Sequence, residues 1–525
     1  MTHLINDPQF GEIIDFDHLM VELQGSYDKM YPDFDMVGAV AVGSKAYNDD
    51  PNYMTAGGAS ILAYSMLLAA EEYELAKEFK GKLFTLGWTE EHTGTDLLSA
   101  TTQATPDESD PTGRSYHIKG RKWLINNSYH AEYHSVVAKV DPTQDGPRAL
   151  SIFIVPRSSC KNWERLETHV LSNMVLTKFD IDGPGILVGK VGHGLNILQR
   201  MSMPAKYICS YLGARLLIQA INASLDHLST KRIFKEHPIN FTNVFRQMYN
   251  IALQSAFMNF AYYRASTFSD SSFLQFHGTM LKSWLLLRCN EIMCDNLLVA
   301  GSKGFLRESV IGRNAIDSFV LPVFDGHYTL NTLMTAKMMD RYLTATDKGN
   351  MEERLAMLRE RIYTTRAGNQ MNIKSTVFRN PEFYDYVDYM KQLGLPFDIN
   401  AQGLVDSTKT LLKELGDNGF DASAEYKYKL GTLVHWLESI QAAAEFWKVT
   451  GEDQYLNAVI QQYNSYVRIF NEIIIEGALQ TEMLTSMKQL PLPDVEDHVS
   501  FLRHMLNHET RWLQREKKPE AALGD

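Results

Sequence analysis

The spacing of apolar residues changes along the chain, and each change marks a boundary between kinds of structure. Up to residue 83 the spacing is helical, with an apolar stripe at 61–69 followed by glutamates at 71, 72 and 74. From residue 84 onward the pattern is typical of short strands separated by Pro, Gly, Asp and Asn. The strands expected in this part are Tyr116–Ile118, Lys122–Ile125, Ser135–Val140 and Ala149–Val155.

Helical spacing returns after the turn at Gly192–Gly194 and predicts long apolar helices near 195–232, 240–268 and 272–300. The segment 344–380 is rich in charged residues and is predicted to be a connector. A second helical block follows it, in which apolar residues again recur every three or four positions: Leu433, Leu437, Ile440, Ala444 and Trp447, and then Leu456, Val459, Tyr463, Val467 and Phe470.

This order of elements predicts a mainly helical α+β fold. The expected parts are an N-terminal helical region at 1–83, a β-domain at 84–190, a C-terminal helical bundle at 191–345 and an additional helical domain at 375–525. At 525 residues the chain exceeds the usual size of a single hydrophobic core, so several domains are expected.

Composition and charge narrow the class of protein. Hydrophobic residues make up 45% of the chain and charged residues 22%, as in ordinary globular proteins. The 63 acidic and 51 basic side chains give a formal net charge of -12, which argues against broad binding of nucleic acid. The acidic N-terminus and the lack of an apolar run of about 20 residues predict neither a secretion signal nor a membrane span.

The cysteines and histidines suggest no metal site. Four cysteines are present and none forms a CxxC pair, so a reducing cytoplasmic location is predicted instead of a disulfide framework or a zinc finger. His504 and His508 lie four residues apart, a spacing that suits zinc, but sequence fixes no third ligand. A solvated helical face is the favoured interpretation of this pair.

Two segments carry the candidate chemistry. The first is Thr89–Asp96, with the sequence TEEHTGTD, followed by Tyr116–Asn127, with the sequence YHIKGRKWLINN. The second is Gly301–Phe305, GSKGF, followed by Asp317 twelve residues after Phe305 and then by Phe324–Gly326, FDG. No GxGxxG motif is present, so a Rossmann dinucleotide site is not indicated.

Both segments resemble motifs of the acyl-CoA dehydrogenases. The first is similar to the TEPxAGSD and YxxxGxKxxITN motifs of that family, and the second to its GGxGY…RDA…YEG run, in the same order. The stretch 84–90, FTLGWTE, also resembles the AidB-like branch. The resemblance covers roughly residues 55–345, and two motifs in the family's order are more specific than either motif alone.

The resemblance implies a fold and an activity. The implied fold is acyl-CoA dehydrogenase-like, with N-terminal helices, a central β-barrel-like domain and a C-terminal helical bundle, to which an extra C-terminal helical block is added. The implied cofactor is FAD, and the implied substrate is an acyl-CoA or an acyl group on a carrier protein. The family removes a proton from the α-carbon and passes a hydride from the β-carbon to the flavin. A homodimer or homotetramer is expected on the same ground.

The resemblance also assigns residues to the site. Asp325 stands where the family keeps its catalytic glutamate. Trp88 and Thr89 are placed beside the flavin ring, Thr95 replaces a serine that touches flavin or substrate, and Asn126 replaces a threonine that meets the flavin. The remaining flavin contacts fall on the run 231–235, with Lys231, Arg232 and Phe234 as the candidates.

Several positions depart from the family. Asp325 is one methylene shorter than glutamate, a reach of roughly 1.5 Å, and a misplacement of about 1 Å can cost on the order of a hundredfold in rate. Leu298 stands in place of a glutamine that contacts the neighbouring subunit's adenine, Ile316 in place of the arginine of RDA, and Lys235 in place of a glycine.

Three functions are therefore open. A specialised flavin-dependent acyl-thioester dehydrogenase or oxidase, with Asp325 as base, is favoured. A flavin monooxygenase on the same scaffold is the second, although such relatives usually lack the acidic base. A non-catalytic fold relative with a decayed flavin site is the third, and Leu298, Lys231 and Ile316 favour it. His327 is expected to be a polar wall residue, with a second acid–base role as the alternative.

Overall fold

The fold is described from a computed structural model of the chain. The chain divides into two compact units, the first reaching Ile208 and the second beginning at Cys209, and each is described by itself. The structure describes residues 16–31, 39, 50–171, 174–265, 271–363, 383–397, 399–417, 423–476 and 489. His504 and His508 lie outside the described residues.

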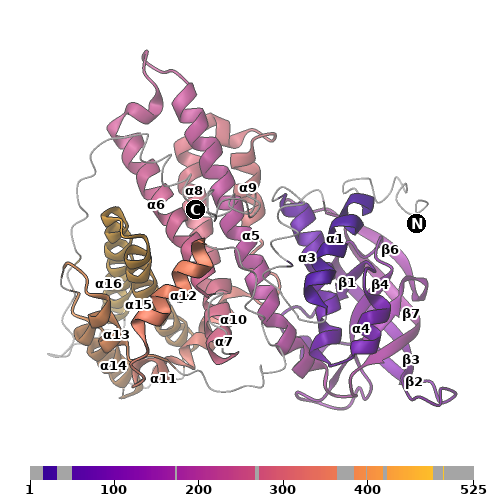
Figure 1. Cartoon of the computed structure of the whole chain (residues 1–525). Coiled ribbons are helices and arrows are strands. Elements are labelled where there is room, and N and C mark those ends of the chain that lie inside the picture. Colours follow the sequence, from indigo (N-terminus) through magenta and orange to yellow (C-terminus); the bar gives the residue numbers. More distant parts are fainter. Residues whose placement is uncertain are drawn as a thin grey trace, which may run out of the picture. The chain divides into compact units, whose positions relative to one another are not determined.

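A sheet of seven strands closes on itself in the first unit (Figure 1). β4 pairs with β5, β5 with β7, β7 with β3, β3 with β2, and β2 with β4, so the pairing returns to its starting strand. The closing β2–β4 contact is one residue pair, Gln103 with Lys139. This closed sheet confirms the predicted β-barrel-like domain. The strands are β1 (Phe84–Gly87), β2 (Gln103–Pro106), β3 (Ser115–Asn126), β4 (Tyr133–Lys139), β5 (Leu150–Pro156), β6 (Cys160–Leu166) and β7 (Leu176–Val188).

The alternation of side chains along the strands fills the inside of this ring. β3 buries every second residue along its first part, and the apolar ones meet those of β4, β5 and β7 in one core. Gly120 on β3 is required here, because a Cβ at this position would fall 2.4 Å from Thr102 Oγ1. The members of this core include Ile118, Ile125, Val136, Phe153, Phe179 and Ile181.

Two of the predicted strands are one strand in the structure. Tyr116–Ile118 and Lys122–Ile125 both belong to β3, whose pairing register with β7 shifts between Lys122 and Ile125. Leu124 has φ +56°, the left-handed backbone of a bulge. The sequence prediction divided the strand because no periodic pattern distinguishes a bulge from a break.

Helices of the first unit pack on the sheet through α3 (Pro51–Ala69), whose Asp50 cap accepts hydrogen bonds from the amides of Asn52 and Tyr53. The Phe84 amide donates to Ser60 Oγ at 3.0 Å, and the Tyr27 hydroxyl donates to the Lys82 carbonyl at 2.6 Å. These bonds join α1 (Phe16–Met30) and α3 to the start of β1. The short α4 (Tyr73–Phe79) follows α3.

The second unit is helical throughout its described part (Figure 1). The sequence prediction of a connector over 344–380 is wrong for residues 351–363, because α12 occupies them. The helices of this unit that follow α5 (Gly194–Thr230) are α6 (Thr242–Ala265), α7 (Ser271–Met280), α8 (Leu286–Ala300), α9 (Val310–Ser318), α10 (Tyr328–Ala336), α11 (Met339–Leu343), α12 (Met351–Tyr363), α13 (Tyr386–Leu393), α14 (Ala401–Asp417), α15 (Ala424–Thr450) and α16 (Leu456–Glu476).

One predicted helix is interrupted by a different kind of turn. The expected helix over 272–300 consists of α7, a π-helical turn at Leu281–Leu285 and α8. A π turn adds a residue to the helix and rotates the side chains that follow it, and such turns often occur at functional sites. Lys282 lies inside this turn and is fully buried.

A buried network of charges joins α15 to the rest of the unit. Arg264 on α6 donates to Glu438 at 2.6 Å and also pairs with Glu445, and all three side chains are at most 4% exposed. The hydroxyl of Tyr342 donates to Glu438 Oε2 at 2.8 Å, and Tyr389 of α13 donates to Glu445. The C-terminal helices are therefore fixed by ion pairs and hydrogen bonds inside the packed core.

Among the described helices, α5 is long and apolar enough to cross a membrane by length and composition. In the structure 78% of its most apolar window is buried by protein, and core helices of globular proteins pass the same test. The two units are defined by contacts within the chain and do not test the predicted domain boundaries. Those boundaries therefore remain predictions: 1–83, 84–190, 191–345 and 375–525.

Candidate active site

Glu90, the acid of the first motif, is buried and holds its own loop in place. One of its carboxylate oxygens accepts hydrogen bonds from the amide and hydroxyl of Thr101, and the other from those of Thr102, at 2.6 to 3.1 Å. Lys122 Nζ lies 2.9 Å from Glu90 Oε1 and also donates to the Val137 carbonyl at 2.9 Å. Glu90 thus connects the motif to the starts and ends of three strands.

The electrostatics of this pair follow from its contacts. Burial alone would raise the pKa of Glu90, but the attraction of Lys122 and the hydrogen bonds from Thr101 and Thr102 outweigh it and lower the pKa to about 2. Burial lowers the pKa of Lys122, and Glu90 opposes that effect. Because every donor and acceptor is matched, we assign Glu90 a structural role.

Three predicted flavin contacts lie at the end of β3 or directly after β1. The bulge in β3 brings the Trp123 amide 3.0 Å from the Thr89 carbonyl, and Thr85 Oγ1 donates to the Asn126 carbonyl. Trp88 Nε1 donates to Ser135 Oγ of β4 at 3.1 Å. Trp88, Thr89 and Asn126 are half-buried here.

Asn126 has unused hydrogen-bonding capacity that suits a ligand. Its Nδ2 donates to the Thr55 carbonyl at 3.3 Å, while its buried Oδ1 has no hydrogen-bond partner among the described residues. A buried amide oxygen without a partner costs free energy unless a donor meets it. A flavin ring, which carries an N–H group, supplies such a donor, so Asn126 fits the implied cofactor. Thr95 is exposed on the loop after Glu90, and the structure does not bring it to this group.

Asp325 lies in a tight turn of the second unit, before α10. Its φ is +52° and that of Gly326 is +99°, so two consecutive residues have left-handed backbone. A glycine meets the second requirement without strain, whereas Asp325 adopts a conformation that only a few per cent of non-glycine residues show. Asn331 Nδ2 donates to the Gly326 carbonyl at 3.0 Å and holds the turn on its C-terminal side. Backbone strain of this kind is often found at functional sites.

The side chain of Asp325 is half-buried and faces few polar groups. Cys209 Sγ of α5 lies 4.0 Å from Asp325 Oδ2. Burial raises the pKa of Asp325, and the attraction of Lys282 partly opposes this rise. His327, two residues on, accepts the Thr329 amide at Nδ1 and stacks on Tyr328 at 4.4 Å between ring centroids. His327 therefore caps α10.

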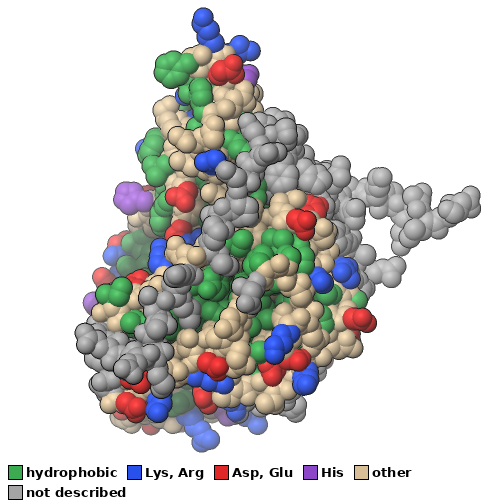
Figure 2. Space-filling model, turned by 90° about the vertical axis from the view of Figure 1, so that its left-hand side faces the viewer, with side chains coloured by type: hydrophobic (Ala, Val, Ile, Leu, Met, Phe, Trp, Pro, Cys, Tyr) green, Lys and Arg blue, Asp and Glu red, His purple; other side chains and the backbone are tan. Residues whose placement is uncertain are grey.

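The run 231–236 forms an exposed turn between α5 and α6. Ile233 and Glu236 bridge, while Phe234 and Lys235 have φ of +51° and +71°. Phe234 is 92% exposed, and Lys231 and Arg232 are exposed beside it. Figure 2 shows basic and hydrophobic side chains together at this projecting end of the second unit, where Figure 1 places the α5–α6 connection.

A second exposed apolar region lies on α8, α9 and the turns beside them. It holds two of the departures from the family motifs, Leu298 at 69% and Ile316 at 49% exposed. Its other members are Phe305, Leu306, Phe319 and Val323.

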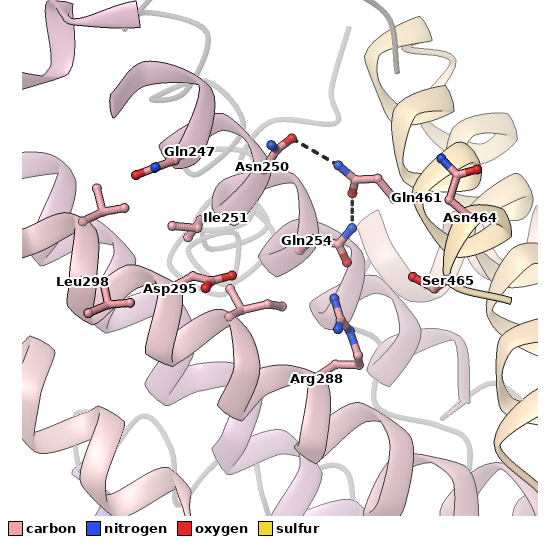
Figure 3. A pocket seen from close by; sticks show the side chains of 12 residues that line it. Gln247, Asn250, Ile251, Gln254, Arg288, Asp295, Leu298, Gln461, Asn464 and Ser465 are labelled. Atoms are coloured by element: carbon pink, nitrogen blue, oxygen red, sulfur yellow. Dashed lines mark hydrogen bonds between the residues drawn. The ribbon is translucent and has the colours of Figure 1, made fainter. Parts of the chain in front are cut away.

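A cavity of about 460 Å³ lies between α6, α8 and α16 (Figure 3). Arg288 of α8 points into it, and Gln461 of α16 donates to Asn250 Oδ1 at 3.2 Å across its edge. None of the residues assigned to the flavin or to proton transfer lines it; of the departures, only Leu298 does. Among the described His, Cys, Asp and Glu residues, no group could hold a metal ion.

The sequence of the β-domain matches a known protein family. Residues 85–174, from β1 to beyond β6, match the family described as acyl-CoA dehydrogenase, middle domain. This part of the chain is therefore similar to the middle domain of the acyl-CoA dehydrogenases. AidB of Escherichia coli is 28% identical over 163 residues, which are 30% of this chain and 28% of AidB. The short/branched chain specific acyl-CoA dehydrogenase of Rattus norvegicus is 21% identical over 280 residues, 51% of this chain and 62% of the rat protein.

A solved structure shares the fold over nearly the whole length. The acyl-CoA dehydrogenase of Bacillus anthracis, complexed with FAD, matches 95% of this chain and 86% of its own chain, with a TM-score of 0.66 and 18% identity. The predicted acyl-CoA dehydrogenase fold is therefore confirmed, and the match extends over the C-terminal helices. The alignments cover less than two thirds of the two curated relatives' own lengths.

Two residues beside Asp325 were missed by sequence reasoning. Lys282 is a single basic residue within the apolar run 279–287, and Cys209 lies inside the long α5. The isolated lysine was a usable signal, because a lysine is almost never fully buried unless it is paired. The roles of Asp325, Trp88, Thr89, Thr95, Asn126, Lys231, Arg232 and Phe234 remain proposals.

Proposed function

We propose that this acyl-CoA dehydrogenase homologue is a flavin-dependent acyl-thioester dehydrogenase or oxidase with Asp325 as its base. The substrate is an acyl-CoA or a carrier-bound acyl group, and the product is its α,β-unsaturated counterpart. The observation that supports this proposal is the strained backbone of Asp325, the residue that the motif resemblance aligns with the family's catalytic glutamate. FAD, when bound, supplies the acceptor for the hydride that leaves the β-carbon.

Asp325 accepts the proton from the α-carbon. Its partial burial favours this task, because desolvation raises the pKa of the carboxyl and makes the carboxylate a stronger base. The attraction of Lys282 opposes that rise. A carboxylate that starts ionised and gains basicity from burial suits proton abstraction beside a thioester.

The remaining assigned residues bind the cofactor in this proposal. Asn126 offers a buried acceptor, and Trp88 and Thr89 provide a ring and a hydroxyl directly after β1. Lys231, Arg232 and Phe234 are exposed on a turn with strained backbone, which supports contacts made outside the chain itself. We therefore propose a homodimer or homotetramer in which this turn meets the cofactor of another copy. A cytoplasmic location stays a prediction.

The test begins with the visible absorption spectrum of the purified protein before and after added FAD. A bound oxidised-flavin spectrum that bleaches anaerobically with a series of acyl-CoAs supports the proposal. Bleaching by NAD(P)H alone, followed by oxygen consumption, would support the monooxygenase alternative. A protein that binds no FAD would support the third alternative, a non-catalytic relative that keeps the fold for binding or assembly.

Asp325→Asn tests the base directly. The variant should retain the flavin spectrum and lose substrate-dependent bleaching by at least a hundredfold, since general-base catalysis contributes about 10² to 10⁴ in rate. Asp340→Asn, an exposed carboxylate of the same unit, is the matched control and should bleach like the parent protein. Unchanged bleaching in Asp325→Asn would remove Asp325 from the mechanism.

A further inference from the structure

Lys282 is a buried cation in the π-helical turn between α7 and α8. Its side chain is 0% exposed, and Leu281, Ser283, Trp284 and Leu285 around it are buried as well. A lysine in such a place needs compensating contacts, because burying an isolated ammonium group is costly. Within the described residues, no carboxylate forms an ion pair with Lys282 at 4.0 Å or less, so its contacts are of another kind.

Two contacts of Lys282 lead to the turn that carries Asp325, and a third is a hydrogen bond with Cys209 of α5. Its Nζ donates a hydrogen bond to the Leu321 carbonyl and lies 4.7 Å from the centroid of the Phe324 ring. A cation over an aromatic face is stabilised by the ring's negative charge distribution. Leu321 and Phe324 precede Asp325 by four residues and one residue, so the ammonium group is anchored along the entry to the turn.

We infer that Lys282 is a positioning residue for Asp325, because it fixes the entry to the turn through Leu321 and Phe324. This inference rests on the proposed role of Asp325 as the base. It assigns the π turn a function, because the extra residue of that turn places a lysine side chain inside a packed helix.

The backbone of the turn explains why an anchor is needed. Asp325 has φ +52°, and residues in such conformations persist only when the surroundings determine them from several sides. Lys282 holds the entry at the Leu321 carbonyl, and Asn331 holds the exit at the Gly326 carbonyl. Aspartate is one methylene shorter than glutamate. If the turn shifts, rotation of the shorter side chain can therefore compensate less for the change in the position of the carboxylate.

The charges around Asp325 leave Lys282 as the main electrostatic influence. In the described part of the chain, the titratable groups that act on Asp325 are Lys282 from the π turn and Cys209 from α5. Burial raises the pKa of the Cys209 thiol to about 12, so it is neutral at physiological pH and faces Asp325 Oδ2 as a weak donor. Removing the charge of Lys282 should therefore raise the pKa of Asp325 further.

The experiment separates charge from hydrogen bonding with two variants. Lys282→Met removes both and keeps an unbranched side chain, whereas Lys282→Gln removes the charge and keeps an N–H donor. Lys337→Met, an exposed lysine near the end of α10, is the matched control. The direct readout is the infrared band of a protonated carboxyl, identified by its loss in Asp325→Asn and followed from pH 5 to pH 9.

The titration midpoint of this band should rise by at least one pH unit in both Lys282 variants, a tenfold change in the ionisation equilibrium, and stay unchanged in Lys337→Met. The acid limb of anaerobic flavin bleaching should move by the same amount. At high pH the rate should recover in Lys282→Gln and stay low in Lys282→Met, whose turn is released.

Unchanged midpoints in folded Lys282→Met or Lys282→Gln would overturn the inference. The proposed function is judged separately. If the midpoint rises in the Lys282 variants but acyl-CoAs never bleach the parent protein, the link between Lys282 and Asp325 stands and the dehydrogenase proposal fails. If Lys282→Met does not fold, Lys282→Gln alone decides the electrostatic part.

Discussion

The side chains of the first motif have two different roles: some stabilise the structure of the site, and others are candidates to contact the cofactor. Glu90 is 5% exposed and its carboxylate oxygens accept hydrogen bonds within the protein, whereas Thr89 beside it is half-buried and is a proposed contact of the cofactor. The TE motif thus contains a structural residue and a candidate contact residue in adjacent positions. A substitution at one should affect stability, and at the other cofactor binding.

Glu90→Gln should lower the free energy of unfolding at pH 7 by about 3 to 5 kcal/mol, because it leaves buried Lys122 without its counter-charge. Urea unfolding measures this loss, and Glu91→Gln, an exposed neighbour, should change it by less than about 0.5 kcal/mol.

The pH dependence of that loss has a definite sign. The pKa of Glu90 is lowered from 4.5 to about 2 on folding, so its stabilising contribution is complete above pH 4.5 and declines as the pH falls toward 2. The difference between parent and Glu90→Gln should therefore shrink in acid. A difference that grows below pH 4 would show that the ion pair is not its source.

The sequence predicted the strands that carry the candidate residues, while the roles of those residues remain predictions. Trp88 and Thr89 directly follow β1 and Asn126 ends β3, a setting that strand periodicity can predict. Thr95 does not join them, since the loop after Glu90 turns back at Thr93 and leaves it exposed. Lys282 could not be related to Asp325 from sequence, because 43 residues and three further elements separate them.

At the scale of elements, α15 decides how the C-terminal helices are held. Its buried Glu438 and Glu445 meet Arg264 of α6, and His435 accepts or donates a hydrogen bond with Thr335 Oγ1 of α10 at 2.9 Å. Burial alone would raise the pKa of Glu445, but Arg264 and Arg354 lower it. The periodic apolar pattern of α15 predicted a helix, but a pattern of apolar positions gives no information on buried charges.

Glu445→Gln should destabilise the second unit by about 3 to 5 kcal/mol, since it leaves the buried guanidinium of Arg264 with one carboxylate in place of two. Circular dichroism during urea unfolding would measure it, with Glu472→Gln on the exposed side of α16 as control. Equal stability of the two variants would mean that packing, and not the charge network, fixes α15.

The π turn is the element that sequence analysis could least foresee. Residues 272–300 have continuous helical spacing, and a single inserted residue changes that spacing too little to be recognised in one sequence. The same limit applies to the bulge in β3. In both cases a local departure from regular geometry brings a candidate site residue into its position.

For the whole molecule, the turn 231–236 and the apolar side chains on α8 and α9 are among the described features that a single copy exposes to solvent. Both hold residues that the motif resemblance assigns to contacts between subunits, although Leu298 and Ile316 differ from the residues usual in the family. Apolar replacements at a polar contact position suit an interface held by packing more than by hydrogen bonds.

Replacing Lys231 and Arg232 together with Ala should raise the dissociation constant for FAD by roughly tenfold or more, because each charge-assisted hydrogen bond contributes about 1.5 to 3 kcal/mol and about 1.4 kcal/mol corresponds to tenfold. Quenching of flavin fluorescence measures the constant. Lys337→Ala, also exposed, should leave it unchanged, and an unchanged constant in the double variant would remove the turn from the cofactor site.

The ring of strands in the first unit closes through a single residue pair, and the Glu90–Lys122 pair lies at that closure. Glu90 binds the two threonines just before β2, while Lys122 of β3 reaches the Val137 carbonyl of β4. If this junction opens, β2 becomes a free edge that can pair with strands of other chains, while β4 stays paired with β1 and β5. Variants that lack the Glu90 carboxylate should therefore accumulate in cells mainly as inclusion bodies. Their yield of soluble protein should fall before the activity of the remaining soluble protein does.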